Sequence, residues 1–169
     1  VDRKQTFVYA LTFGNFTEVT YRTPQKMKNW LGYRAYVLYG FVTFRKIHSY
    51  HIAVKTPNLN FSGEYVFGAI SNSKSMGNIF HFDPETYALD DGEFEVLFIK
   101  KPRSVKDLRQ ILHGMIQNDY SGKMFVTFKA SELSIRSSKP IAWNIDGEYG
   151  GDKKTIEIKN RHQSIELVI

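Results

Sequence analysis

Short apolar runs, many with two-residue alternation and most bounded by turn residues, fill most of the chain and constrain its fold more than any other feature. Two-residue alternation is the pattern of a half-buried β-strand. Aromatic residues make up 15% of the chain, mostly Phe and Tyr, and such side chains suit a pleated sheet surface. The runs that predict strands are residues 7–16, 41–47, 50–55, 64–70, 94–100, 123–129, 132–136, 141–145, 155–159 and 164–169. Residues 58–60 and 62–63 are predicted as turns, and residues 71–91 as a loop.

Two segments have helical spacing instead. Thr23-Pro24 has the pattern of a helix start, and apolar residues follow at helical intervals as far as Gly40. Ser104 with Asp107 three positions later resembles a capping box, and Leu108 to Ile116 would line one apolar face. Together these patterns predict a mainly β fold: a two-layer β-sandwich of about ten strands with two inserted helices, in a single unit spanning residues 1–169.

Composition removes several classes of function. The chain has no cysteine, which excludes disulfides, thiolate zinc sites and cysteine nucleophiles. Residues 30–44 are strongly apolar, but this stretch of about 15 residues contains Arg34 and is shorter than the roughly 20 that a membrane span requires. This stretch is therefore predicted to be a buried element of a soluble protein. The lack of cysteine fits a reducing compartment, and the expected location is cytoplasmic.

The net charge is +6, and basic residues gather at Lys100, Lys101, Arg103 and Lys106. Such a surface is compatible with a plain solvated face, with anionic membrane or with nucleic acid. No aromatic RNA-binding pattern, helix-turn-helix spacing or zinc motif accompanies it, so nucleic acid is the least favoured partner.

The segment Trp143-Asn-Ile-Asp-Gly-Glu-Tyr-Gly-Gly151 is the most informative for function. If it is one strand, Asp146 and Glu148 project from the same face, and Gly147 leaves room for a ligand between them. Alternatively, Asp146-Gly147 is a hairpin turn, since Asp-Gly between strands is a strong signal for one. Gly150-Gly151-Asp152 offers a competing turn that better matches the lengths of the predicted flanking strands.

Trp-x-Ile-Asp-Gly-Glu followed by a short turn and terminal strands resembles the C-terminal domain of the diacylglycerol kinase and bacterial lipid kinase family, which includes sphingosine kinases. The resemblance extends upstream, so that it covers nearly the whole chain. It includes Phe13-Gly-Asn-Phe16, Thr23-Pro-Gln-Lys26, Leu31-Gly-Tyr-Arg-Ala-Tyr36, Ser71-Asn72, Gly77, Pro84 and Asp90-Asp-Gly92. The Gly-Gly-Asp-Gly-Thr loop that holds nucleotide phosphates in this family does not occur in the chain.

The resemblance implies a two-domain lipid kinase in which this chain is the C-terminal β-sandwich domain and an N-terminal nucleotide-binding domain is absent from it. A lipid hydroxyl, such as that of diacylglycerol, would attack the γ-phosphate of ATP in the presence of Mg²⁺. Asp146 would act as the general base, and Glu148 would support it or help to hold catalytic Mg²⁺. The chain alone would be inactive.

The same resemblance implies a structural Mg²⁺ held by the side chain of Asp91 and by the backbone carbonyls of Ala88 and Glu93. An ordinary Asp-Gly turn before a strand is the alternative at this position. The expected partners are a lipid substrate at a membrane surface, with peripheral membrane association, and the N-terminal domain; a homodimer is a further possible assembly. The competing hypothesis is a non-catalytic β-sandwich that binds anionic membrane or a protein through its basic residues.

Overall fold

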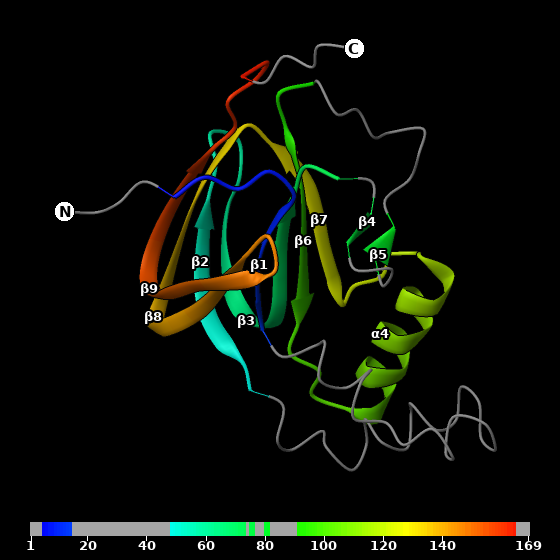
Figure 1. The fold of residues 1–169 in the computed structure, drawn as a ribbon. Coiled ribbons are helices and arrows are strands. Elements are labelled where there is room, and N and C mark those ends of the chain that lie inside the picture. The colour runs from blue at the N-terminus through cyan, green and yellow to red at the C-terminus, as the bar shows by residue number, and fades with distance from the viewer. Residues whose placement is uncertain (1–4, 15–47, 74, 77–79, 82–90, 165–169) are drawn as a thin grey trace.

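One strongly curled antiparallel sheet, with a helix packed against its outer face, forms the body of the structure (Figure 1). The computed structural model describes residues 5–14, 48–73, 75–76, 80–81 and 91–164. The described elements are β1 (Ala10–Gly14), β2 (Tyr50–Lys55), β3 (Asn60–Ser71), β4 (Ser75–Met76), β5 (Phe80–His81), β6 (Phe94–Lys100), α4 (Val105–Gln117), β7 (Phe125–Ala130), β8 (Glu132–Ile145) and β9 (Glu148–Lys159).

The main sheet closes on itself through two long strands. Its order is β1-β8-β2-β3-β6-β7, with β9 paired to β8, and β1 pairs with β3 as well. Residues 134–137 of β8 pair with β2, whereas residues 143–145 pair with β1. In the same way, β3 pairs with β2 over residues 60–65 and with β1 over residues 67–71. The resulting ring β1-β8-β2-β3 gives a barrel-like arrangement, and the predicted mainly β, sandwich-like fold is confirmed.

Apolar side chains fill two cores, one on each face of the sheet. Strand β6 contributes to both by alternation: Phe94, Val96 and Phe98 face the inner core, and Leu97 and Ile99 face the outer one. The inner core also holds aromatic and branched residues from the other strands, namely Leu11, Phe13, Ile52, Val54, Tyr65, Ile70, Leu133, Ile135, Ile141, Trp143 and Ile158.

Helix α4 covers the outer core and begins as the sequence predicts. Ser104 is its N-cap, and the Ser104 hydroxyl oxygen accepts a hydrogen bond from the N–H of Asp107 at 3.1 Å. Leu108, Ile111 and Leu112 are buried, but Ile116 is 53% exposed, so the predicted apolar face ends one turn early. Within the described residues, no helix is both long enough and apolar enough to span a bilayer.

The predicted strands at residues 50–55 and 94–100 are confirmed with the same bounds. Residues 132–136 and 141–145 prove to be one bent strand, β8, and residues 62–63 lie inside β3 rather than in a turn. The predicted loop at residues 71–91 contains the short pair β4–β5. The helix predicted after Thr23 and the strand at 41–47 lie outside the described residues, as does all but Ser164 of the strand at 164–169.

Candidate functional site

The acidic segment near the end of the chain is a tight hairpin turn. Ile145 at the end of β8 pairs with Glu148 at the start of β9, which leaves Asp146 and Gly147 as a two-residue loop. Both have positive φ, 49° and 97°, as in the type I′ turn that joins twisted strands. The prediction that Asp146 and Glu148 share one face of a single strand is therefore wrong, and so is the preference for a turn at Gly150-Gly151.

Gly150 and Gly151 lie inside β9, where the pairing register shifts. Trp143 pairs with Gly151 and Asn144 with Tyr149, so Gly150 is an extra residue in the ladder. Because of this bulge, β9 continues through Gly150 and Gly151, where the sequence predicted a turn. A side chain at Gly150 would meet Ile145, because an added Cβ lies 2.5 Å from Ile145 Cγ1.

Backbone N–H groups hold the carboxylate of Asp146. Asp146 Oδ1 accepts hydrogen bonds from the N–H groups of Tyr9 at 2.9 Å and Ala10 at 2.8 Å, and Oδ2 accepts one from Val8 at 2.8 Å. Burial alone would raise the pKa of the Asp146 carboxyl, but these three donors outweigh it and the pKa lies below its ordinary value. The carboxylate is thus fixed in orientation and stays ionised.

The other half of the predicted catalytic pair is less constrained. Glu148 is the first residue of β9 and is exposed. The N–H of Gly147, between the two acids, donates to Asn144 Oδ1 at 2.9 Å, so the turn is closed by a side chain from β8. Glu148 therefore stands on the far side of a fixed turn from Asp146.

Strand pairing brings the second acidic segment to the same end of the sheet as this turn. Leu11 of β1 pairs with Ile145, and its neighbour Ala10 pairs with Ser71 of β3. Ser71 also pairs with Glu95 at the start of β6. Since neighbouring strands lie about 4.8 Å apart, the hairpin turn and the start of β6 are separated by about three strand spacings.

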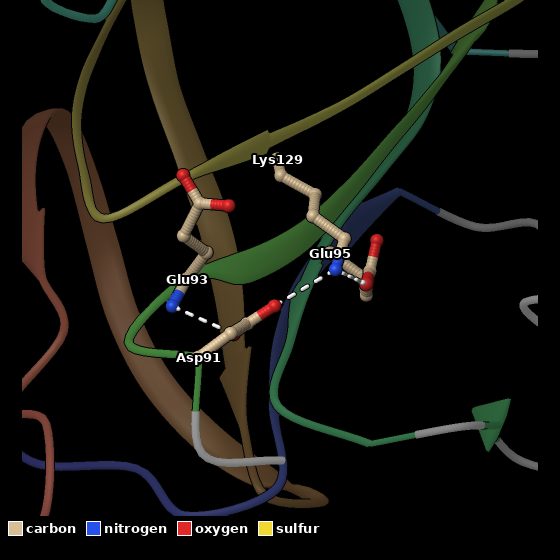
Figure 2. A network of polar contacts seen from close by, with 4 residues as sticks. All are labelled: Asp91, Glu93, Glu95 and Lys129. Atoms are coloured by element: carbon tan, nitrogen blue, oxygen red, sulfur yellow. Dashed lines mark hydrogen bonds and ion pairs between the residues drawn. The ribbon is translucent and has the colours of Figure 1, made fainter. Parts of the chain in front are cut away.

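Asp91, Glu95 and Lys129 form an ion-pair network at the start of β6 (Figure 2). Lys129 Nζ lies 2.8 Å from Asp91 Oδ2 and 3.1 Å from Glu95 Oε1. The N–H of Glu93 donates to Asp91 Oδ1 at 3.0 Å, while the side-chain carboxylate of Glu93 lies apart from the Lys129 ammonium. The three side chains of the network are between 14% and 28% exposed, so solvent screens their attraction only in part.

The two carboxyl groups of this network respond differently. Burial would raise the pKa of Asp91, but the Lys129 ammonium and the Glu93 N–H outweigh it and lower that pKa. Burial dominates at Glu95 and raises its pKa, despite the contact with Lys129. The pKa of Lys129 is raised, chiefly by its hydrogen bond to Asp91. Asp91 is accordingly the stable anion of the pair.

Asp91 has the chemistry of a metal ligand but not a complete site. Its two oxygens can accept about four hydrogen bonds or ligand contacts, and two of these positions are used. Ala88 lies outside the described residues. Among the described side chains, no group of three or more His, Asp or Glu residues could hold a metal ion. A cation at Asp91 would therefore need backbone carbonyls or water as further ligands, which is the kind of oxygen shell that Mg²⁺ takes.

The sequence-based prediction missed three parts of this site. Lys129 and Glu95 are cross-strand neighbours, and their pairing depends on the register of β6 with β7. The third part is the backbone of residues 8–10, whose N–H groups leave no sequence pattern.

The predicted basic cluster lies where β6 ends and α4 begins. Lys101 is paired with Glu64 at 2.9 Å, while Arg103 and Lys106 are exposed. Val105, between them, is 40% exposed. The cluster therefore combines cations with one exposed apolar side chain.

The fold is shared with a solved structure. A solved structure from Bacillus anthracis, described as that of a diacylglycerol kinase, superposes on the chain with a TM-score of 0.59 at 18% identity, covering 94% of this chain and 50% of that one. At this identity the match establishes the fold alone. Comparison with models of known protein families finds no match.

Two curated relatives are named diacylglycerol kinase. The protein from Bacillus subtilis is 26% identical over 147 residues, covering 87% of this chain and 48% of its own length. The protein from Staphylococcus epidermidis is 28% identical over 162 residues, covering 95% and 50%. The chain spans about half the length of these relatives. These matches agree with the sequence-based resemblance to the C-terminal domain of diacylglycerol-kinase-like lipid kinases.

Proposed function

We propose that the chain is the C-terminal domain of a lipid kinase that transfers the γ-phosphate of ATP to a lipid hydroxyl such as that of diacylglycerol. Residues 1–169 would supply the acceptor side of a cleft, and a preceding nucleotide-binding domain would supply most of the ATP site. The observation that carries the proposal is the fixed, ionised carboxylate of Asp146 at a hairpin tip, within a chain similar to diacylglycerol kinases.

Asp146 has the capacity to orient one hydroxyl. A carboxylate offers about four acceptor positions, and three are taken by the N–H groups of Val8, Tyr9 and Ala10. Oδ2 has one partner, so the remaining position lies there. The lowered pKa makes Asp146 a weak base for an alcohol. Phosphoryl transfer through a loose transition state needs little early proton removal, so orientation of the hydroxyl contributes more than basicity.

Glu148 would support Asp146 from the other side of the turn or help to hold catalytic Mg²⁺. When bound, Mg²⁺ would supply positive charge that stabilises the negative charge of the transferring phosphoryl group. In the second acidic segment, Asp91 with the carbonyls of Ala88 and Glu93 would hold a structural Mg²⁺. Asp91, Glu95 and Lys129 carry a formal charge of about −1 when all are ionised, which favours a cation nearby.

A lipid acceptor requires contact with a membrane surface. The basic cluster of Lys100, Lys101, Arg103 and Lys106, with the exposed Val105, suits a peripheral contact with anionic lipid at the cytoplasmic face. The proposed membrane contact can be tested separately from catalysis, because it depends on none of the acidic residues.

The test of catalysis uses the full-length parent protein with ATP, Mg²⁺ and diacylglycerol in mixed micelles. Asp146→Asn should reduce phosphate transfer at least ~100-fold, the lower range for loss of a group that acts in proton transfer. Glu157→Gln is the matched control, because Glu157 is an exposed acid on the same hairpin, away from its tip. Activity of Asp146→Asn equal to that of the control would contradict the assignment.

The second candidate is a non-catalytic domain that binds anionic membrane. The exposed Val105 among cations favours it. Vesicles containing anionic phospholipid should then bind the chain, with binding weakened by salt and by Lys100→Glu with Lys106→Glu. Lys154→Glu with Lys159→Glu gives the same change in net charge at two exposed positions of β9. This candidate alone predicts full function in Asp146→Asn.

A further inference from the structure

We propose that the backbone of residues 8–10 is the positioning element of the Asp146 carboxylate, so that the segment leading into β1 sets the geometry of the proposed acceptor site. We call residues 5–10 the incoming segment. The inference rests on the proposed function, in which Asp146 orients the lipid hydroxyl, and it adds a role for residues that carry no chemistry in their side chains.

The donors are three successive N–H groups directed at one carboxylate. Successive backbone N–H groups that converge in this way form a concave anion site, with fixed partial charges that need no reorganisation. Donors on both oxygens restrict rotation of the carboxylate. In return, the N–H of Asp146 donates to the carbonyl of Ala10 at 2.9 Å, which ties the turn itself to the same segment.

The incoming segment is in turn anchored on its other side. The carbonyl of Tyr9 accepts hydrogen bonds from the N–H of Asn72 at 3.0 Å and from Ser71 Oγ at 3.2 Å. Tyr9 Oη donates to the carbonyl of Ser75 at 2.9 Å. At its start, Gln5 Oε1 accepts from Lys153 Nζ of β9 at 2.7 Å. The position of Asp146 is therefore fixed relative to the end of β3 through the Tyr9 backbone, and relative to β4 through the Tyr9 hydroxyl.

Backbone groups of the incoming segment hold Asp146. The hydrogen bonds that hold the Asp146 carboxylate come from the backbone N–H groups of Val8, Tyr9 and Ala10. Val8 is 61% exposed. A substitution at Val8 that keeps its N–H should thus leave Asp146 unchanged, whereas one that removes the N–H should not.

The experiment compares Val8→Pro with Val8→Ala in the 169-residue chain. Proline lacks the N–H, and alanine keeps it while removing most of the side chain. The readout is the titration of the Asp146 carboxyl carbon by NMR. We expect Val8→Pro to raise the pKa of Asp146 and Val8→Ala to leave it at the wild-type value. Equal pKa values in the two variants would overturn the inference.

A second measurement covers the case in which Val8→Pro does not fold. In Asp146→Asn, amide hydrogen exchange at Val8 should accelerate about tenfold, since the single amide oxygen can still accept from Tyr9 and Ala10 but an NH2 group replaces the Oδ2 that accepts from Val8. Glu157→Gln should leave this rate unchanged. Unchanged exchange in Asp146→Asn would equally overturn the inference.

Failure of the inference differs from failure of the proposed function. Activity retained by Asp146→Asn in the full-length parent would remove the catalytic role while the NMR and exchange results stand. If Asp146→Asn abolishes activity but Val8→Pro leaves both the pKa of Asp146 and the acidic limb of the pH–rate profile unchanged, the catalytic role stands and the positioning role is wrong.

Discussion

Ala10 and Asp146 are joined by two hydrogen bonds of opposite direction. The N–H of Ala10 donates to Asp146 Oδ1 at 2.8 Å, and the N–H of Asp146 donates to the carbonyl of Ala10 at 2.9 Å. The first residue of β1 and the first residue of the hairpin turn thus hold each other, although 136 positions separate them. The contact stabilises the ring of strands as well as shaping the candidate site.

Asp146→Asn should lower the free energy of unfolding by about 1–2 kcal/mol at pH 7, because it removes charge-assisted hydrogen bonds at a partly exposed position. The pKa of Asp146 in the folded chain lies below its ordinary value of 3.8. Its contribution to stability is therefore complete above that value and is lost as pH falls through the lower, folded pKa. Urea unfolding at several pH values should show the difference between wild type and variant shrinking below about pH 4. A constant difference down to pH 2 would contradict this explanation.

Asp91→Asn should destabilise the chain more than Glu95→Gln at pH 7, although both acids contact Lys129. The surroundings lower the pKa of Asp91 and so favour its charged form, whereas burial raises the pKa of Glu95 and disfavours it. We expect a loss of about 1 kcal/mol for Asp91→Asn, typical of a hydrogen-bonded ion pair that solvent screens in part. Urea unfolding of the two variants measures the order directly, and the reverse order would refute it.

Gly68→Ala should destabilise the inner core by about 3 kcal/mol, the upper part of the usual range for overpacking. An added Cβ would lie 2.1 Å from Phe13 Cε1 and 2.6 Å from Phe98 Cδ1, and both rings are buried. Gly122→Ala is the control, since its Cβ would meet Phe125 at 3.8 Å, an ordinary contact. Thermal unfolding should separate the two variants clearly; similar midpoints would mean that the rings have room to move.

Ser104→Ala should cost about 1 kcal/mol by loss of the N-cap of α4. The Ser104 hydroxyl accepts from the N–H of Asp107, and Asp107 in turn accepts from the N–H of Arg103 at 3.1 Å. Ser104→Asp keeps an acceptor at the cap and should stay within a few tenths of a kcal/mol of wild type. Chemical denaturation followed by circular dichroism tests both, and equal losses would show that the cap contributes nothing.

Local pattern was enough to predict β2, β6 and the start of α4. In each case the periodicity and the turn or cap residues that determine the element lie within a few positions of it. The ring of strands was beyond such reasoning, because β1 pairs with residues 143–145 and no short-range signal encodes that pairing. The bend that joins residues 132–136 and 141–145 into one strand depends on the same closure.

The candidate site shows the same limit. Asp146 and Glu148 stand out in the sequence, but Asp146-Gly147 and Gly150-Gly151 are both acceptable turns, and only the bulge at Gly150 distinguishes them. The role of Lys129 could be recognised only from the register in which β6 pairs with β7. The donors of residues 8–10 could not be predicted, because every residue other than proline has the same N–H.

The closure of β1 between β3 and β8 also bears on how the chain acquires its structure. Strand β1 is made before its partners in β8, which follow more than a hundred residues later. Pairings so distant in sequence are slow to form, and a strand that waits for its partners exposes unpaired edges to other chains. We therefore expect a nascent chain that stops before residue 143 to be prone to aggregation. The sheet can close only after the β8–β9 hairpin has left the ribosome.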